Sequence, residues 1–178
     1  MDRAKEKHRL IEQARKVVAE VARDQCQLSG ACVVSSVAAG DFTSASDVDI
    51  LMVDETGEGR PDVYRRLVDG RVFEWAIIPS EHLTDMDSVL ADAGLTHDVL
   101  TAVILLDKGG WLEKVQHEVQ RRYQEPEGIW RRATAQLQRI RKAVDRMRQR
   151  LEEGKILPAQ RCHVSVLKGA FALPRALL

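Results

Sequence analysis

Two aspartates at the start of an apolar run constrain the fold of this chain more than any other feature. Asp47 and Asp49 begin the sequence D-V-D-I-L-M-V, which ends at Val53. Residues two apart in a β-strand point to the same face, so both carboxylates would project from one side of a half-buried strand. Their negative charges repel each other there unless a counter-ion binds them. The run therefore predicts a strand with a site for a hard, oxygen-seeking cation such as Mg²⁺.

A third carboxylate lies in a second apolar run. Glu74 is the only acid in R-V-F-E-W-A-I-I-P, between Phe73 and Trp75. An ionised side chain in such a strand needs an ion pair or a metal ion. We expect this strand to lie beside the strand of Asp47, so that the carboxylates hold two ions, about 3.5–4 Å apart, for phosphoryl chemistry.

A hydroxyl-rich segment of small residues precedes the two aspartates. Ser35 and Ser36 follow an apolar run, and hydroxyls with consecutive N–H groups at a strand-to-helix turn can hold phosphate oxygens. Small residues follow up to Gly40, so a polyphosphate can approach the backbone closely. The composition of residues 38–46 predicts a loop that ends at Ser46.

These motifs resemble the signature of the nucleotidyltransferase superfamily, which includes DNA polymerase beta and kanamycin nucleotidyltransferase. The family signature is Gly-Ser, about ten residues, and then Asp-x-Asp or Asp-x-Glu. Here nine residues separate Ser36 from S-D-V-D, and Ser35 stands in place of the glycine. The third carboxylate, usually aspartate, is Glu74. The resemblance covers residues 5–120. Within this range, I-L-L-D-K-G-G-W-L at 104–112 is similar to the strand and turn that follow the third carboxylate in the antibiotic-modifying and minimal branches of the superfamily.

The resemblance implies roles for particular residues, because the family serine contacts the terminal phosphates of the nucleotide and the three carboxylates bind two Mg²⁺ ions. By this resemblance the catalytic residues and metal ligands are Asp47, Asp49 and Glu74, and the nucleotide-binding residues are Ser35, Ser36, Gly40, Ser46, Asp47 and Asp49.

The resemblance also implies an activity. We expect a Mg²⁺-dependent nucleotidyltransferase that moves a nucleoside monophosphate, AMP from ATP, to a hydroxyl of a small-molecule acceptor and releases pyrophosphate. Aminoglycosides or related natural products are acceptors by analogy alone. Two alternatives stay open: a minimal-nucleotidyltransferase-type partner or antitoxin acting on a small helical protein, and an inactive nucleotide-binding regulator, which Ser35 favours. Nucleic acid is a further alternative partner because of the arginine-rich sequence at 131–154.

Hydrophobic periodicity predicts an α+β fold, with a small mixed β-sheet of the nucleotidyltransferase type followed by a helical C-terminal region. We expect a catalytic domain over residues 1–124 and a helical region over 125–178. The final A-L-P-R-A-L-L has no cap or polar tail, which favours the start of a longer helical domain. Helices are expected at 3–25, 63–68, 81–91, 111–123, 126–153 and from 157 onward, and strands at 31–37, 47–53, 71–78 and 99–106.

Charge and composition bear on partners and location. Residues 1–120 carry 13 Lys+Arg and 22 Asp+Glu, whereas residues 121–178 carry 14 and 5. Either the two halves face each other across an anionic ligand, or the basic helices are simply solvated. No apolar run approaches the roughly 20 residues of a membrane span, and the charged N-terminus is unlike a signal peptide. We therefore expect a cytoplasmic protein, with Cys32 as a buried, inert thiol.

Overall fold

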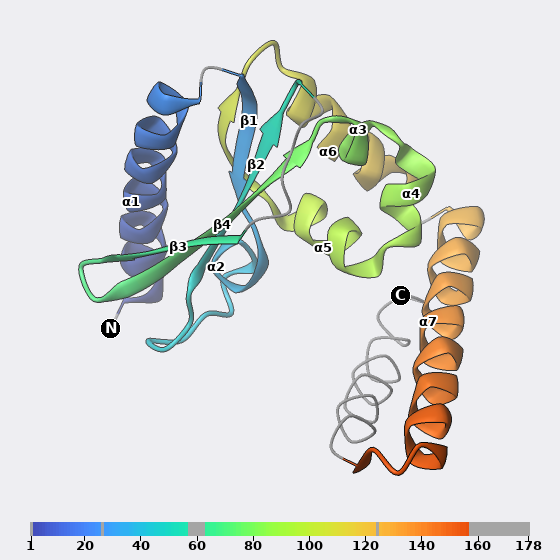
Figure 1. Ribbon diagram of the computed structural model, residues 1–178. Helices are drawn as coiled ribbons and strands as arrows, with labels where there is room; N and C mark the ends of the chain where they lie inside the picture. The colour runs from blue at the N-terminus through green and yellow to red at the C-terminus, as the bar shows by residue number, and fades with distance from the viewer. Residues whose placement is uncertain (1, 26, 57–62, 124, 157–178) are drawn as a thin grey trace. The chain divides into compact units, whose positions relative to one another are not determined.

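A computed structural model describes residues 2–25, 27–56, 63–123 and 125–156 of the chain. The helix expected from residue 157 onward lies outside these residues. Helices and strands follow each other along the chain as Figure 1 shows. Their bounds are α1 Arg3–Asp24, β1 Leu28–Val33, α2 Ser35–Ala39, β2 Val48–Asp54, β3 Val63–Val68, β4 Arg71–Pro79, α3 Glu81–Thr84, α4 Met86–Ala91, α5 Ala93–Thr101, β5 Val103–Asp107, α6 Trp111–Tyr123 and α7 Pro126–Glu152.

The chain divides into two compact units. The first contains Met1–Met86 and His97–Val119, and therefore the whole sheet. The second contains Asp87–Thr96 and the described residues from Gln120 onward, including α7. Within the described part of the chain, no helix is both long and apolar enough to cross a membrane.

The first unit is built on a five-stranded mixed sheet in the order β3-β4-β2-β1-β5. β2 and β4 are parallel, whereas the pairs β1–β2, β1–β5 and β3–β4 are antiparallel. The predicted α+β class with a mixed sheet is confirmed. The predicted adjacency of the Asp47 strand and the Glu74 strand is also confirmed, because these runs form β2 and β4.

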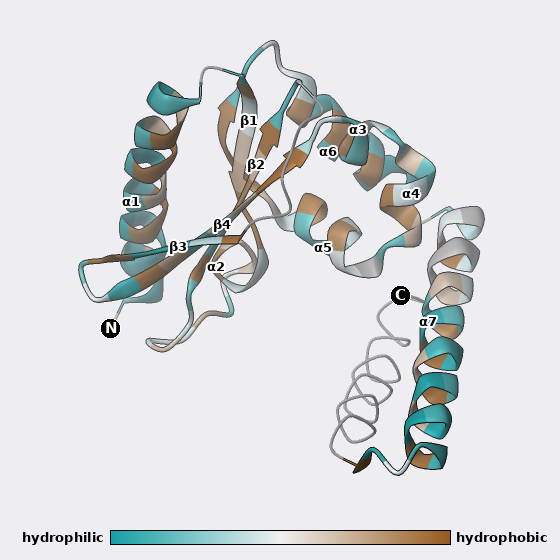
Figure 2. Ribbon diagram, in the orientation of Figure 1, coloured by the Kyte–Doolittle hydropathy of each residue, from teal (hydrophilic) through white to brown (hydrophobic). Residues whose placement is uncertain are grey.

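Helix α1 packs on the sheet through the stripe expected from its sequence. Figure 2 shows hydrophobic residues in the central strands and along one side of α1. Leu10 and Ala14 of this helix are fully buried in the same cluster as Met52 of β2 and Phe73 of β4. Cys32 of β1 is buried as predicted, and burial raises the pKa of its thiol to about 12, so the thiol is protonated and inert.

The predicted helix at 63–68 is wrong, because these residues form the edge strand β3. β3 and β4 make a hairpin closed by Asp69 and Gly70, which both have positive φ, 48° and 78°. Asp-Gly favours this two-residue turn, whose twist matches that of the paired strands.

Further boundaries differ from the sequence prediction. The strand expected at 31–37 is β1, which begins at Leu28 and ends at Val33, and the helix expected at 81–91 is divided into α3 and α4. Residues 99–101 belong to α5, and the strand β5 begins only at Val103. The segment expected as a loop at 38–46 begins inside the short helix α2, which ends at Ala39. Short apolar runs do not separate helix from strand by periodicity alone. In contrast, α7 matches its prediction closely, and Gly154 adopts the positive φ expected of the residue that follows a helix.

Candidate active site

The pairing of β2 with β4 brings two of the predicted carboxylates together. In this parallel pair Asp49 stands directly opposite Glu74, and residues opposite each other on neighbouring strands point to the same face. Val48 and Ile50, on either side of Asp49, are buried in the core shared with α1. Asp49 and Glu74 therefore project from the sheet face opposite α1, and both are half-buried.

Asp47 lies just before β2 and is exposed. Its charge acts on Asp49: burial raises the pKa of Asp49, and the neighbouring Asp47 raises it further. Glu74 and Asp98 add smaller effects of the same sign, whereas a hydrogen bond from the Ser35 hydroxyl acts in the opposite direction. The site thus gathers negative charge that is not fully compensated, which a bound cation would stabilise.

Glu74 has an ion-pair partner. Arg65 of β3 stands opposite Glu74 in the antiparallel pair and donates a hydrogen bond to its carboxylate. As the side chains stand, no three His, Cys, Asp or Glu residues in the described ranges are arranged to hold a metal ion. The carboxylate oxygens near Asp49 fit the ligand preference of Mg²⁺, and one of the two Glu74 oxygens, Oε2, is bonded to Arg65.

Ser35 and Ser36 lie where β1 passes into α2, rather than inside the strand expected at 31–37. The Val34 N–H donates to the Asp49 carbonyl at 2.9 Å, which ties this turn to β2. Ser35 has a φ of 58°, in the left-handed region, where a residue with a Cβ costs about 1–2 kcal/mol. The position that is glycine in the family thus keeps a glycine-like backbone conformation here.

Gly40 and Ser46, the other predicted nucleotide-binding residues, have structural roles in the segment between α2 and β2. Gly40 ends α2 with a φ of 87°, and its N–H donates to the Ser36 carbonyl at 2.9 Å. The Ser46 hydroxyl accepts a hydrogen bond from the Thr43 N–H at 3.0 Å. Both residues therefore shape the backbone that leads from the Ser35 turn to Asp47.

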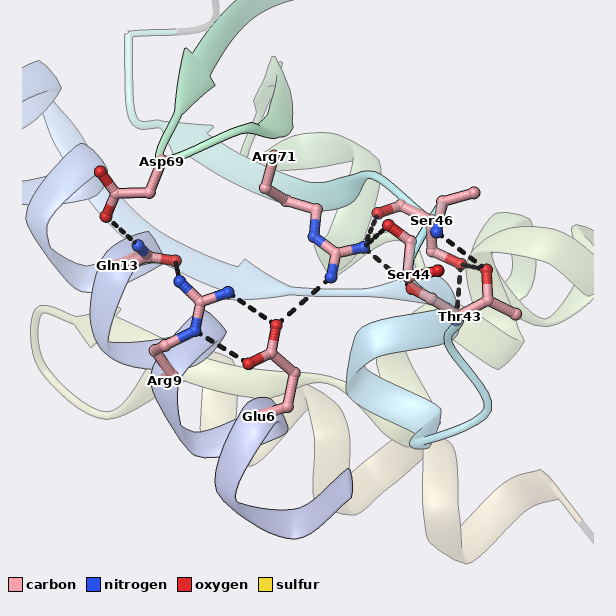
Figure 3. A network of polar contacts seen from close by, with 9 residues as sticks. Glu6, Arg9, Gln13, Thr43, Ser44, Ser46, Asp69 and Arg71 are labelled. Atoms are coloured by element: carbon pink, nitrogen blue, oxygen red, sulfur yellow. Dashed lines mark hydrogen bonds and ion pairs between the residues drawn. The ribbon is translucent and has the colours of Figure 1, made fainter. Parts of the chain in front are cut away.

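A buried arginine holds this segment in place. Arg71 of β4 is 8% exposed, and its Nη1 donates to the carbonyls of Thr43, Ser44 and Ser46 at 2.7–2.8 Å. Its Nη2 contacts Glu6 of α1 at 3.3 Å. Figure 3 shows this network, which continues from Glu6 through Arg9 to Gln13 and Asp69. The loop that positions Asp47 is thus fastened to both β4 and α1.

Two residues that sequence reasoning missed belong to this region. Asp98 of α5 accepts hydrogen bonds from the Ser35 N–H and the Ser35 hydroxyl, at 3.2 and 3.3 Å. Arg71 anchors the loop before Asp47. Neither lies in a recognisable motif, and each reaches its partner only through tertiary contacts, so the sequence carried no local signal for either role.

The fold has a counterpart among solved structures. A nucleotidyltransferase-like protein from Exiguobacterium sibiricum 255-15 matches with a TM-score of 0.53 at 13% sequence identity. The fold is nucleotidyltransferase-like. The match covers 94% of this chain and 57% of the other chain, so this chain spans less than two thirds of that protein. No protein-family model and no curated protein matches the sequence.

The raised pKa of Asp49 leads to a prediction about stability. The folded state binds a proton at Asp49 more readily than the unfolded state, so ionised Asp49 destabilises the fold at neutral pH. Asp49→Asn should therefore raise the free energy of unfolding at pH 7 in metal-free buffer, by no more than about 1 kcal/mol because solvent screens this half-exposed site. The gain should shrink as the pH falls through the raised pKa and vanish below the ordinary value of 3.8.

Urea denaturation at pH 7 and at pH 3.5 measures this difference. Asp145→Asn, at an exposed position of α7, is the matched control, and we expect little change from it at either pH. A less stable Asp49→Asn variant at pH 7 would show that the carboxylate is compensated in the folded protein.

Proposed function

We propose that this protein is a Mg²⁺-dependent nucleotidyltransferase that moves AMP from ATP to a hydroxyl group of a small-molecule acceptor. The observation that carries the proposal is the pairing of Asp49 with Glu74 on adjacent strands, beside the Ser35 turn. A turn with two hydroxyls next to carboxylates whose charge is only partly compensated suits a metal-bound triphosphate. The nucleotidyltransferase-like fold supports the same kind of reaction.

In the proposed reaction the acceptor oxygen attacks the α-phosphorus of ATP. A new phosphorus–oxygen bond forms, the bond to the bridging oxygen of pyrophosphate breaks, and the hydroxyl proton passes to a base. Glu74 is our candidate for that base, once it has separated from Arg65. Asp47 and Asp49 would hold Mg²⁺, and Ser36 would contact the terminal phosphates. When bound, Mg²⁺ supplies charge neutralisation on the phosphates and lowers the pKa of the attacking hydroxyl.

Calorimetric titration of MgATP into the purified protein tests this proposal. We expect the wild type to bind MgATP in a Mg²⁺-dependent way. In Asp47→Asn/Asp49→Asn the affinity for MgATP should fall at least about tenfold, because two charged ligands of the metal are lost. Asp145→Asn is again the control that removes one negative charge elsewhere. A folded wild-type protein that does not bind MgATP would contradict the ATP-dependent activity and direct the search to other nucleotides.

An inactive nucleotide-binding regulator is the second candidate, and one observation favours it. Ser35 stands where the family signature has glycine, and its side chain takes up space at the turn where we expect phosphate to approach. Pyrophosphate release in the presence of aminoglycosides and related hydroxylated compounds separates the two candidates. An enzyme releases pyrophosphate with one of these acceptors, whereas a regulator binds MgATP without turnover.

A further inference from the structure

We infer that Asp98 is a positioning residue that holds the Ser35 turn in the left-handed conformation that a glycine would adopt unaided. Ser35 has a φ of 58°, a region that residues with a Cβ seldom occupy unless surrounding contacts stabilise them. Its two polar groups that face Asp98, the backbone N–H and the side-chain hydroxyl, both donate to the same Oδ1 atom. These two bonds stabilise the strained residue, and the N–H bond to Asp98 is independent of the hydroxyl, which also lies within reach of Asp49.

Asp98 reaches this turn because of the sheet topology. It lies in α5, 63 positions after Ser35, and α5 leads directly into β5. β5 runs antiparallel to β1, with Val33 opposite Val103 and Cys32 opposite Ile104. The start of β5 therefore lies beside the end of β1, and the last turns of α5 come next to the Ser35 turn. Asp98 also lies near Cys32 of β1, because burial raises the pKa of the Cys32 thiol and the charge of Asp98 raises it further.

The consequence for nucleotide binding rests on the proposed function. If the Ser35 turn contacts the phosphates of ATP, its backbone must already be in place before the nucleotide arrives, and Asp98 provides that preorganisation. A carboxylate near a triphosphate is unfavourable by charge alone, and Asp98 also adds to the negative charge around Asp49. Its retention at this position is explained by the two hydrogen bonds that it accepts.

Variants at the two positions separate the hydrogen bonds from the charge. Asp98→Ala removes the acceptor, whereas Asp98→Asn removes the charge and keeps an oxygen that can accept both bonds. Ser35→Gly removes the strain that Asp98 offsets. The test measures the urea midpoint and the Kd for MgATP of the wild type, Ser35→Gly, Asp98→Asn, Asp98→Ala, Ser35→Gly/Asp98→Ala and the control Asp145→Asn.

We expect Asp98→Ala to lower the urea midpoint and to weaken MgATP binding about tenfold, the size of one lost hydrogen bond to a charged acceptor. Asp98→Asn should stay within about threefold of the wild type, since a neutral acceptor keeps most of that bond. When Ser35 is glycine, the same Asp98→Ala change should cost about threefold or less, because a turn without strain does not need the acceptor.

Equal losses from Asp98→Ala in the serine and glycine backgrounds would overturn the inference, as would equal losses from Asp98→Asn and Asp98→Ala. The urea midpoints need no nucleotide. If the folded wild type does not bind MgATP, the proposed function fails. The urea midpoints still decide whether Asp98 positions Ser35, because they show whether the effects of Ser35→Gly and Asp98→Ala depend on each other.

Discussion

Replacing Arg71 by methionine should lower the free energy of unfolding by about 3 kcal/mol and weaken metal binding at Asp47. The guanidinium is buried, and its loss removes a donor from three backbone carbonyls, of Thr43, Ser44 and Ser46. The Thr43 carbonyl keeps the Ser46 N–H as a second donor, at 3.3 Å. These bonds are part-buried, and hydrogen bonds to a charged group contribute about 1.5–3 kcal/mol, so we expect the three together to be worth about 3 kcal/mol after water has replaced the lost donor. Glu6 keeps its bonds to Arg9, so no acid is left fully unpaired.

Arg71 also acts on the site through the loop it holds. Its Nη1 bonds to Ser46, the residue directly before Asp47, at 2.7 Å. Without this bond the loop gains conformations, and some binding energy must then be used to order it. We therefore expect Arg71→Met to raise the Kd for Mn²⁺, used as a probe of the metal site that we propose, as well as to lower stability. Arg71→Lys should recover only part of either loss, since one ammonium cannot reproduce the planar donor set.

Urea denaturation and Mn²⁺ titration measure the two effects. Arg66→Met is the matched control, because Arg66 is a half-exposed arginine of the neighbouring strand that pairs with Glu20 of α1. A surface ion pair of this kind contributes less than about 1 kcal/mol. If Arg71→Met is no more destabilising than Arg66→Met, the loop is held by other contacts and our description of its anchoring is wrong.

Local sequence patterns were enough to predict one part of the site. The spacing of Asp47 and Asp49 and the lone acid in the Glu74 run were enough to predict two neighbouring strands, and β2 and β4 are neighbours. The register of β2 and β4 places Asp49 and Glu74 on one face, whereas Asp47 lies just before β2. The role of the carboxylates as metal ligands stays a prediction, because Glu74 is paired with Arg65 in this structure.

The rest depended on contacts between residues far apart in the sequence. Asp98 reaches Ser35 only because β5 pairs with β1. Arg71 reaches its three carbonyls only because β4 pairs with β2, which places the start of β4 beside the loop before β2. No periodicity or spacing marks either residue. The β3 strand is a different case, since its Asp69-Gly70 turn was visible in the sequence and a helix was predicted in spite of it.

Phe42→Ala should cost about 3–5 kcal/mol, the usual range for a fully buried phenylalanine. Phe42 lies in the segment between α2 and β2, and its ring is 1% exposed in the core shared with Leu10 and Phe73. The Arg3 guanidinium lies over the ring, 6.0 Å from its centre. A loss of this size is a large part of the stability of an ordinary domain, about 5–15 kcal/mol.

Phe42 is the apolar counterpart of Arg71, because the same short loop is fastened by a ring in the core and by a guanidinium on its carbonyls. We therefore expect the folded Phe42→Ala variant, in buffer without urea, to bind Mn²⁺ with a higher Kd than the wild type. The reason is that the backbone before Asp47 loses its fixed position. Phe42→Leu is the control: it keeps most of the buried volume and should cost less than about 1.5 kcal/mol. Denaturation midpoints and Mn²⁺ titrations of both variants give the answer. If Phe42→Ala loses stability but binds Mn²⁺ as the wild type does, the core does not support the carboxylate site, and Arg71 alone positions Asp47.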